Sequence, residues 1–170
     1  MDLKAYIRDI PDFPEPGILF RDITPLLQSP AAFRYAVDQL KEHVQSMPID
    51  AIVAVESRGF LFGAPLAYQL GKALVPVRKR GKLPSKTFAT DYSLEYGSNS
   101  MEIHADGVAS GARVLLMDDL LATGGTLAAT ARLVEMSGAR VTGIGLVIEL
   151  LALKGREKLK GYNVFSLIQY

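Results

Sequence analysis

The chain has 170 residues, with 19 basic and 18 acidic side chains, no cysteine and a formal net charge of +1. This length favours one domain, spanning residues 1–170, and is enough to bury a core without disulfides or a structural metal. The near-neutral charge argues against a general binder of nucleic acid or of membrane surfaces, and the lack of cysteine excludes disulfide and thiolate-metal frameworks.

The N-terminus and the longest apolar run favour a soluble protein. The first ten residues, MDLKAYIRDI, carry charges throughout and lack the apolar centre of a signal peptide. The longest apolar stretch, 141–153, is too short to span a bilayer and contains Glu149. We therefore expect a soluble, cytoplasmic protein.

The N-terminal part of the chain predicts two helices separated by a breaker. Residues 2–10 can form a short helix, which cannot continue through 11–17 because that stretch contains three prolines and a glycine. After Ser29 and Pro30, apolar residues recur at 33, 36, 37, 40 and 44, which is helical spacing. The serine is a suitable N-cap and the proline suits a first turn, so this helix is expected to start there.

The rest of the chain alternates short apolar strands with helices. One helix is expected within 57–70, closed by Gly71, and another from about 125 to 137, ended by Gly138. The expected strands are 51–55, 73–77, 113–117, 139–150 and 162–169. This alternation predicts an α/β fold with a mainly parallel sheet flanked by helices on both faces, and ligands of such sheets bind at the carboxyl ends of the strands.

The segment 78–104 interrupts this alternation, because it is polar and contains two glycines and a proline. Its flanks, 86–90 and 100–105, alternate in polarity and could pair as a hairpin. The middle, 91–97, has no packing pattern. Long irregular segments in compact domains are often functional lids, so a lid is expected here.

Residues 122–126, Ala-Thr-Gly-Gly-Thr, occupy a strand-to-helix turn that suits an anion. The two glycines allow a close approach of the backbone, and the two threonines offer hydroxyls. The helix that follows directs its free N–H groups and its positive dipole end at the same place, which predicts a phosphate site. The turn is not a Walker A loop, because no lysine follows the glycines. Taken alone, it could equally be a simple turn.

Two adjacent carboxylates, Asp118 and Asp119, precede this turn. Successive side chains of a strand point in opposite directions, so both cannot reach solvent from a buried strand. Asp119 could cap a loop, but the pair and the turn together suggest a ligand that carries hydroxyls or a metal near its phosphate.

Several motifs together resemble those of the type I phosphoribosyltransferases, in particular the branch that acts on adenine. The resemblance covers nearly the whole chain, in the stretches PDFPEPGILFRDITPLL, ESRGFLFGAPLA, RKRGKLP, YSLEYG, DDLLATGGT, LKGREKL and FSLIQY. It implies the type I phosphoribosyltransferase fold, with an N-terminal base-binding hood over 1–29 and a flexible hairpin lid over 78–104. The implied reaction joins adenine to 5-phosphoribosyl-1-diphosphate and gives AMP and diphosphate. The resemblance also implies a homodimer, and Mg²⁺ held mainly by the diphosphate of the substrate.

The resemblance implies a role for each motif residue. Asp118 and Asp119 would face the ribose hydroxyls and the positive charge that develops on the ribose ring. The 5′-phosphate would be bound by Ala122, Thr123, Gly124, Gly125 and Thr126. The diphosphate would be bound by Ser57, Arg58, Arg78, Lys79 and Lys82, partly across a dimer interface. Adenine would be bound by Leu19, Phe20, Arg21 and Leu150.

Proton transfer at the purine requires an acid or base, for which Glu95 is the candidate. Relatives that take 6-oxopurines commonly carry an aspartate at the position of Ala122, where it can serve N7, and alanine cannot do so. Glu95 on the lid is then the available acid or base, and Tyr96 would help to exclude water. His43 and His104 have no metal-ligand spacing and are expected to be structural.

Simpler interpretations of these residues stay open. Ser57 could cap a helix beside a solvated Arg58, the cation run could be a solvated hairpin, Leu19 and Phe20 could be core residues, and the lid carboxylate could be merely solvated. Glu149 could contact the base region.

Three other functions are also open: transfer to xanthine, guanine or hypoxanthine, a non-catalytic regulator that binds phosphoribosyl diphosphate, and a structural domain that binds a sugar phosphate. Ala122 argues against the hypoxanthine–guanine type, and the neutral charge argues against a DNA-binding regulator.

Overall fold

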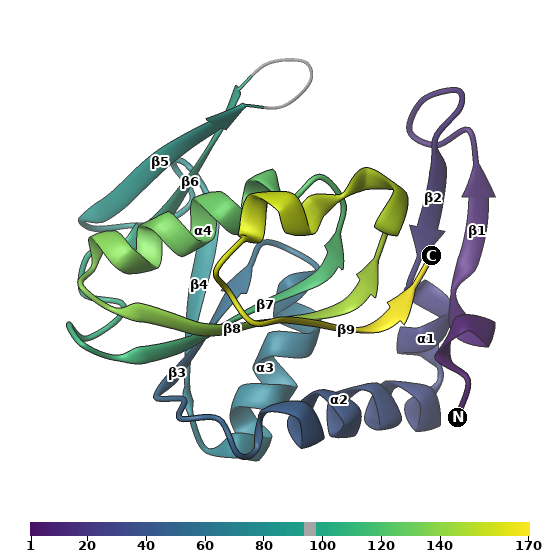
Figure 1. Ribbon diagram of the computed structural model, residues 1–170, viewed down its shortest axis with the longest axis horizontal. Coiled ribbons are helices and arrows are strands. Elements are labelled where there is room, and N and C mark those ends of the chain that lie inside the picture. The colour runs from purple at the N-terminus through teal and green to yellow at the C-terminus, as the bar shows by residue number, and fades with distance from the viewer. Residues whose placement is uncertain (94–97) are drawn as a thin grey trace.

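In the computed structural model, which describes residues 1–93 and 98–170, a seven-stranded sheet runs through the centre of the molecule (Figure 1). Its order is β5-β6-β4-β3-β7-β8-β9. The strands β4, β3, β7, β8 and β9 are parallel, whereas β6 is antiparallel to both β4 and β5. The strands are β3 (Ala51–Val55), β4 (Ala73–Lys79), β5 (Thr87–Ser93), β6 (Ser98–His104), β7 (Arg113–Leu121), β8 (Arg140–Glu149) and β9 (Val164–Gln169). The predicted mainly parallel sheet is therefore confirmed.

Helices cover both faces of the sheet. In Figure 1, α2 and α3 lie below the sheet and α4 lies above it. Ser29 begins α2 as predicted, since its hydroxyl accepts the N–H of Ala32 at 3.3 Å, and Gly71 ends α3 in the left-handed conformation. The α-helices are α1 (Thr24–Gln28), α2 (Pro30–Val44), α3 (Gly59–Leu70) and α4 (Gly125–Met136). Three short 3₁₀ helices are η1 (Leu3–Tyr6), η2 (Leu151–Leu153) and η3 (Gly155–Leu159).

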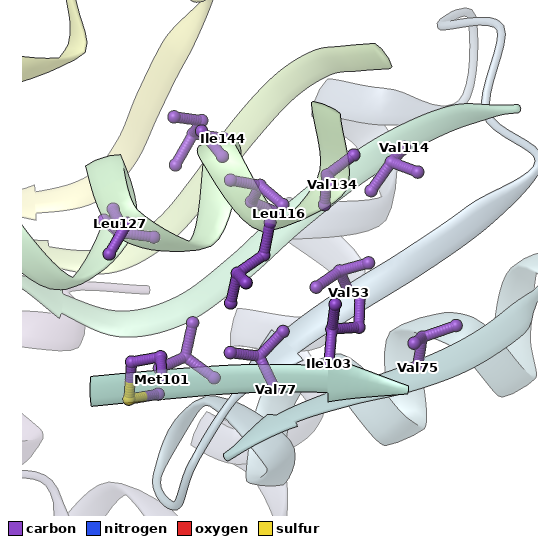
Figure 2. Close-up of a cluster of buried hydrophobic side chains, with 14 of the residues drawn as sticks. Val53, Val75, Val77, Met101, Ile103, Val114, Leu116, Leu127, Val134 and Ile144 are labelled. Atoms are coloured by element: carbon purple, nitrogen blue, oxygen red, sulfur yellow. The ribbon is translucent and has the colours of Figure 1, made fainter. Parts of the chain in front are cut away.

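The core consists of two apolar layers, one on each face of the sheet. Every residue of β3 is buried, as its unbroken apolar run predicts for a strand covered on both sides. One layer lies between the sheet and α4, and Figure 2 shows its centre, with Leu116 and Leu127 among the labelled side chains. The other layer contains Phe62 and Leu40, from α3 and α2. This packing makes the carboxyl ends of the central strands a rigid platform.

The first ten residues differ from their prediction as a helix. Only Leu3–Tyr6 is helical, and β1 (Arg8–Pro11) then pairs with β2 (Leu19–Asp22) in a separate antiparallel hairpin. The proline-rich stretch becomes the turn of this hairpin, where Gly17 has a φ of +86° and the N–H of Phe13 donates to the carbonyl of Ile18. The hairpin stands beside the end of β9, at the right of Figure 1.

The segment 78–104 is more regular than predicted. The expected pairing of 86–90 with 100–105 is confirmed, but the hairpin is longer and joins the main sheet, where Arg78 lies opposite Glu102. Polar residues hid these strands, because the strands lie at the edge of the sheet and expose one face to water. Residues 94–97 lie outside the described part of the chain.

The strands β4 and β7 also extend beyond their predicted ends. Lys79 is the last residue of β4, and Asp118 and Asp119 lie within β7, although their charges suggested loops. Among residues 1–93 and 98–170, no helix is long and apolar enough to cross a membrane.

Candidate active site

The carboxyl ends of β3, β4 and β7 open into a cavity of about 660 Å³. This is the edge of the sheet at which the alternating pattern predicts a ligand. The β5–β6 hairpin and the start of α4 complete its walls. The residues that line the cavity are Val55, Glu56, Ser57, Arg58, Lys79, Lys82, Tyr92, Asn99, Met101, Asp118, Asp119, Leu120 and Thr126.

A smaller pocket of about 80 Å³ lies inside the turn between β7 and α4. All five residues predicted to bind a phosphate line it, together with Asp118 and Leu120, which also line the larger cavity. Gly124 has a φ of +80°, and a Cβ atom there would lie 2.4 Å from the carbonyl oxygen of Gly155. Because α4 begins at the next residue, the turn presents helical N–H groups to the pocket.

The two aspartates lie side by side in a largely dehydrated place. Asp119 is buried, Asp118 is half-buried, and the N–H of Asp119 donates to Asp118 Oδ1 at 2.8 Å. Burial and the neighbouring charge of Asp119 raise the pKa of Asp118 well above its usual value. Burial also raises the pKa of Asp119, although the charge of Arg58 opposes this shift.

Arg58 connects the acid pair with the N-terminal hairpin. Its Nε lies 2.8 Å from Asp119 Oδ2, but the N–H is not aligned, so Oδ2 has no hydrogen-bond donor in the described structure. The guanidinium also lies over the ring of Phe20, 5.2 Å from its centroid. Beside this ion pair, Asp119 Oδ2 can still accept a hydrogen bond from a ligand hydroxyl.

Of the four cations predicted to bind diphosphate, Arg58, Lys79 and Lys82 line the cavity and Arg78 does not. The guanidinium of Arg78 pairs with Glu56 at 2.9 Å and donates to the carbonyl of Lys82 at 3.2 Å. The other oxygen of Glu56 accepts the backbone N–H of Lys79 at 2.9 Å. In this structure Arg78 therefore organises the cationic loop, and the two lysines face the cavity.

Glu102 is a second organiser of this loop that sequence reasoning missed. It is buried, and it accepts the N–H groups of Lys82 at 3.1 Å and Leu83 at 2.9 Å. Burial opposes its ionisation, but the backbone N–H groups of residues 81–83 outweigh it and lower the pKa of Glu102. The only signal in the sequence is an acidic residue in an alternating strand, which normally indicates a solvated face.

The residues predicted to contact adenine lie outside the larger cavity, although Phe20 contacts the cavity residue Arg58. Leu19 and Phe20 belong to β2, and Leu19 is 44% exposed, so the interpretation of Leu19 as a core residue is wrong. The side chain of Arg21 pairs with Asp9 and lies over the ring of Tyr170. None of these residues, nor Leu150 after β8, lines the larger cavity itself.

Tyr92 is a further cavity residue that the sequence did not single out. It is buried, and its hydroxyl lies 3.3 Å from that of Thr126 in the phosphate turn. The hairpin thereby contacts the start of α4. Glu95 and Tyr96, the predicted acid or base and its lid partner, lie outside the described residues.

The histidines and Glu149 take no visible part in the cavity. His43 stacks on Phe165 and bonds to a backbone carbonyl of its own helix, which fits the structural role predicted for it. His104 ends β6. The carboxylate of Glu149 is bonded to Arg156 and to residues of β9, and does not line the cavity.

Comparisons with known proteins agree with this geometry. The family model described as a phosphoribosyl transferase domain matches residues 23–169. An adenine phosphoribosyltransferase of Carboxydothermus hydrogenoformans is 59% identical over 100% of both chains. The crystal structure of the enzyme of that name from Thermoanaerobacter pseudethanolicus is 53% identical, with a TM-score of 0.97 over 99% of this chain and 98% of that one.

A third relative carries ligands. The adenine phosphoribosyltransferase of Saccharomyces cerevisiae, crystallised with an imino-altritol bisphosphate and adenine, is 44% identical, with a TM-score of 0.92 over 98% of this chain and 96% of that one. Similarity of this extent, over the whole chain and over the strands and turns that form the cavity, leaves one assignment. The protein belongs to the phosphoribosyl transferase family, within its group of adenine phosphoribosyltransferases.

Proposed function

We propose that this protein is a purine salvage enzyme that transfers the 5-phosphoribosyl group of 5-phosphoribosyl-1-diphosphate to N9 of adenine, with release of diphosphate and formation of AMP. The observation that carries this proposal is that the acid pair and two lysines line one cavity, which shares Asp118, Leu120 and Thr126 with the adjoining pocket of the phosphate turn. The relatives of this chain support adenine as the base. Ala122 supports the same choice, because it offers no carboxylate to an oxopurine.

The site separates the charges of a phosphoribosyl substrate. Neutral donors of the turn surround the position proposed for the 5′-phosphate. The ribose hydroxyls and the developing ring cation are proposed to lie against Asp118 and Asp119, which line the adjoining cavity. One carboxylate about 5 Å from that cation is worth roughly 3 kcal/mol at an effective dielectric of 20, or about a hundredfold in rate. We therefore assign both residues to stabilisation of the oxocarbenium-like transition state.

The diphosphate is proposed to lie against Lys79, Lys82, Ser57 and Arg58, all of which line the cavity. The positive charge of Lys79, Lys82 and Arg58 favours departure of the leaving group. The described residues contain no cluster of three or more potential metal ligands. Mg²⁺ commonly binds through one or two carboxylates together with substrate phosphates, so we propose that Mg²⁺ enters with the diphosphate.

Adenine is proposed to stack against Phe20, with Leu19, Arg21 and Leu150 around its edge. The contact between Arg58 and Phe20 supports this position, since it places the hairpin at the mouth of the cavity. By family resemblance, Glu95 exchanges a proton with the purine and Tyr96 excludes water. Turnover that is unchanged in Glu95→Gln would contradict the role of the carboxylate.

We further propose a homodimer in the cytoplasm. Tyr68 is 90% exposed on α3, and Leu61 lies seven residues earlier on the same side of this helix, also exposed. Large apolar side chains gathered on one helix face commonly mark an interface. Sedimentation equilibrium tests the dimer, and Tyr68→Asp is expected to dissociate it.

The function is tested by incubating the protein with adenine, phosphoribosyl diphosphate and Mg²⁺ while both products are followed. We expect AMP and diphosphate to appear in equal amounts. Saturable binding of phosphoribosyl diphosphate without formation of AMP would favour a regulator that has kept the fold and lost the reaction.

A further inference from the structure

Glu149 forms a buried polar cluster that the proposed reaction does not use. Its side chain, 3% exposed, ends β8. It accepts hydrogen bonds from Arg156 Nε at 2.6 Å, Arg156 Nη2 at 2.7 Å, the hydroxyl of Ser166 at 2.7 Å and the amide of Gln169 at 3.3 Å. These donors hold the pKa of Glu149 below its usual value, with Arg156 contributing most.

Arg156 uses all of its guanidinium nitrogens to hold one segment in place. Besides the two bonds to Glu149, its Nη1 donates to the carbonyl of Val164 at 2.8 Å, at the start of β9. The arginine thereby ties η3 to the ends of two neighbouring strands. A planar two-point contact of this kind fixes orientation as well as distance.

The residue next to Arg156 lies directly against the phosphate turn. A Cβ atom on Gly155 would lie 2.3 Å from the carbonyl oxygen of Ala122 and 2.7 Å from the side chain of Leu121. A Cβ atom on Gly124 would lie 2.4 Å from the carbonyl oxygen of Gly155. The two backbones thus approach each other closely at both glycines, without room for a side chain between them.

We propose that Arg156 and Glu149 are positioning residues for the 5′-phosphate site, which they hold in its binding geometry through Gly155. This inference rests on the proposed function, since it names the turn as the place where the phosphate binds. A displacement of about 1 Å in a site can cost up to about a hundredfold in rate, so the support of such a turn matters as much as its own donors.

If Arg156 and Glu149 only stabilised the fold, their substitution would lower the Tm without selectively weakening the binding of ribose 5-phosphate. The side chain of Arg156 is 45% exposed, and Leu159 anchors the same 3₁₀ helix in the core beneath α4. Substitution of the arginine should therefore leave the chain folded and loosen only the contact with the turn. The chain also offers a matched control. Arg113 makes a similar two-point contact with Asp50, at 2.9 and 2.8 Å, at the opposite end of β7.

The test is calorimetric titration of the full-length protein with ribose 5-phosphate and, separately, with diphosphate, which is expected to bind at the lysines. The variants are Arg156→Ala, Arg156→Lys, Glu149→Gln and the control Arg113→Ala, with thermal unfolding measured for each. We expect the Kd of ribose 5-phosphate to rise about tenfold in Arg156→Ala and Glu149→Gln, and less in Arg156→Lys. The Kd of diphosphate should stay within about twofold in these variants, and both constants should do so in Arg113→Ala.

Two results would overturn the proposal. One is a Kd for ribose 5-phosphate within about twofold of the unsubstituted protein in every folded variant, even if the Tm falls. The other is an equal weakening of both ligands, which would indicate general loosening. If Arg156→Ala does not fold, Arg156→Lys and Glu149→Gln decide the question. Since binding needs no turnover, a protein that binds ribose 5-phosphate and forms no AMP would refute the proposed function alone.

Discussion

At the scale of single residues, the acid pair Asp118 and Asp119 combines a contiguous sequence motif, burial and a proposed role in the reaction. Asp118 and Asp119 are adjacent and largely dehydrated, and Arg58 compensates part of the charge of Asp119. Such an arrangement disfavours the empty site and favours a ligand that develops positive charge. The same two residues therefore carry consequences for both rate and stability.

The first consequence concerns turnover. We predict that Asp118→Asn and Asp119→Asn each lower kcat by about a hundredfold at a pH at which both carboxylates are ionised, because the amide retains hydrogen bonding to a diol but loses the charge that faces the transition state. The Kd of AMP, which carries no ring cation, should change much less. Steady-state kinetics and calorimetry measure the two effects, with the exposed Asp106→Asn as control. Equal losses in kcat and in AMP affinity would count against the electrostatic role.

The second consequence concerns stability and its pH dependence. The pKa of Asp118 is raised in the folded protein, so folding favours the protonated form of this side chain. The folded protein is therefore less stable at a pH at which Asp118 must ionise than at low pH, where it is protonated in both states. Asp118→Asn should therefore raise the Tm at pH 7, by about 2–4 °C for each 1 kcal/mol gained in the free energy of unfolding.

The advantage of this variant should shrink as the pH falls toward 4, where the unfolded aspartate also takes up its proton. Thermal unfolding between pH 4 and pH 8 measures the change, again with Asp106→Asn beside it. A variant less stable than the unsubstituted protein at pH 7 would show that the charge of Asp118 is not a cost to the fold.

At the scale of elements, the loop after β4 depends on a carboxylate from another strand. Glu102 in β6 accepts two backbone N–H groups of the loop that carries Lys82. We predict that Glu102→Gln raises the KM for phosphoribosyl diphosphate about tenfold, since an amide provides weaker acceptors to these N–H groups. The KM for adenine should change little. A rise in the adenine KM of equal size would contradict a role confined to the cationic loop.

Local signals explain which elements the sequence could predict. The strand 51–55 and the helix from Ser29 were predicted because an apolar run and a cap are encoded within a few residues. The hairpin of β1 and β2 was missed, since its polar strands form only through pairing with each other. The ends of β4 and β7 were missed for a related reason: their charged residues are stabilised by partners from distant segments.

The site follows the same division. The phosphate turn and the acid pair were predictable because each is a contiguous motif. Glu56, Tyr92 and Glu102 were not, because their roles arise only when three separate strands meet. The placement of Arg78 against Glu56 likewise depends on the pairing of β3 with β4.

At the scale of the whole molecule, we propose that different strand ends of the sheet bind different parts of one ligand. In the proposed complex, the turn after β7 would bind the phosphate, the end of β7 the ribose, the ends of β3 and β4 the diphosphate, and the N-terminal hairpin the base; Figure 1 shows where these elements lie. The proposed direction of the substrate follows from this order. Selectivity for the base depends mainly on the N-terminal hairpin, whereas the residues proposed to bind the phosphate and diphosphate would serve any purine.

The most direct test of the account is therefore a comparison of bases. The value of kcat/KM is measured for adenine, hypoxanthine, guanine and xanthine at the same concentrations of phosphoribosyl diphosphate and Mg²⁺. We predict that adenine exceeds each of the other three by at least about a hundredfold, as expected when buried polar groups are matched to one base edge. A comparable or higher kcat/KM for any oxopurine would contradict the assignment.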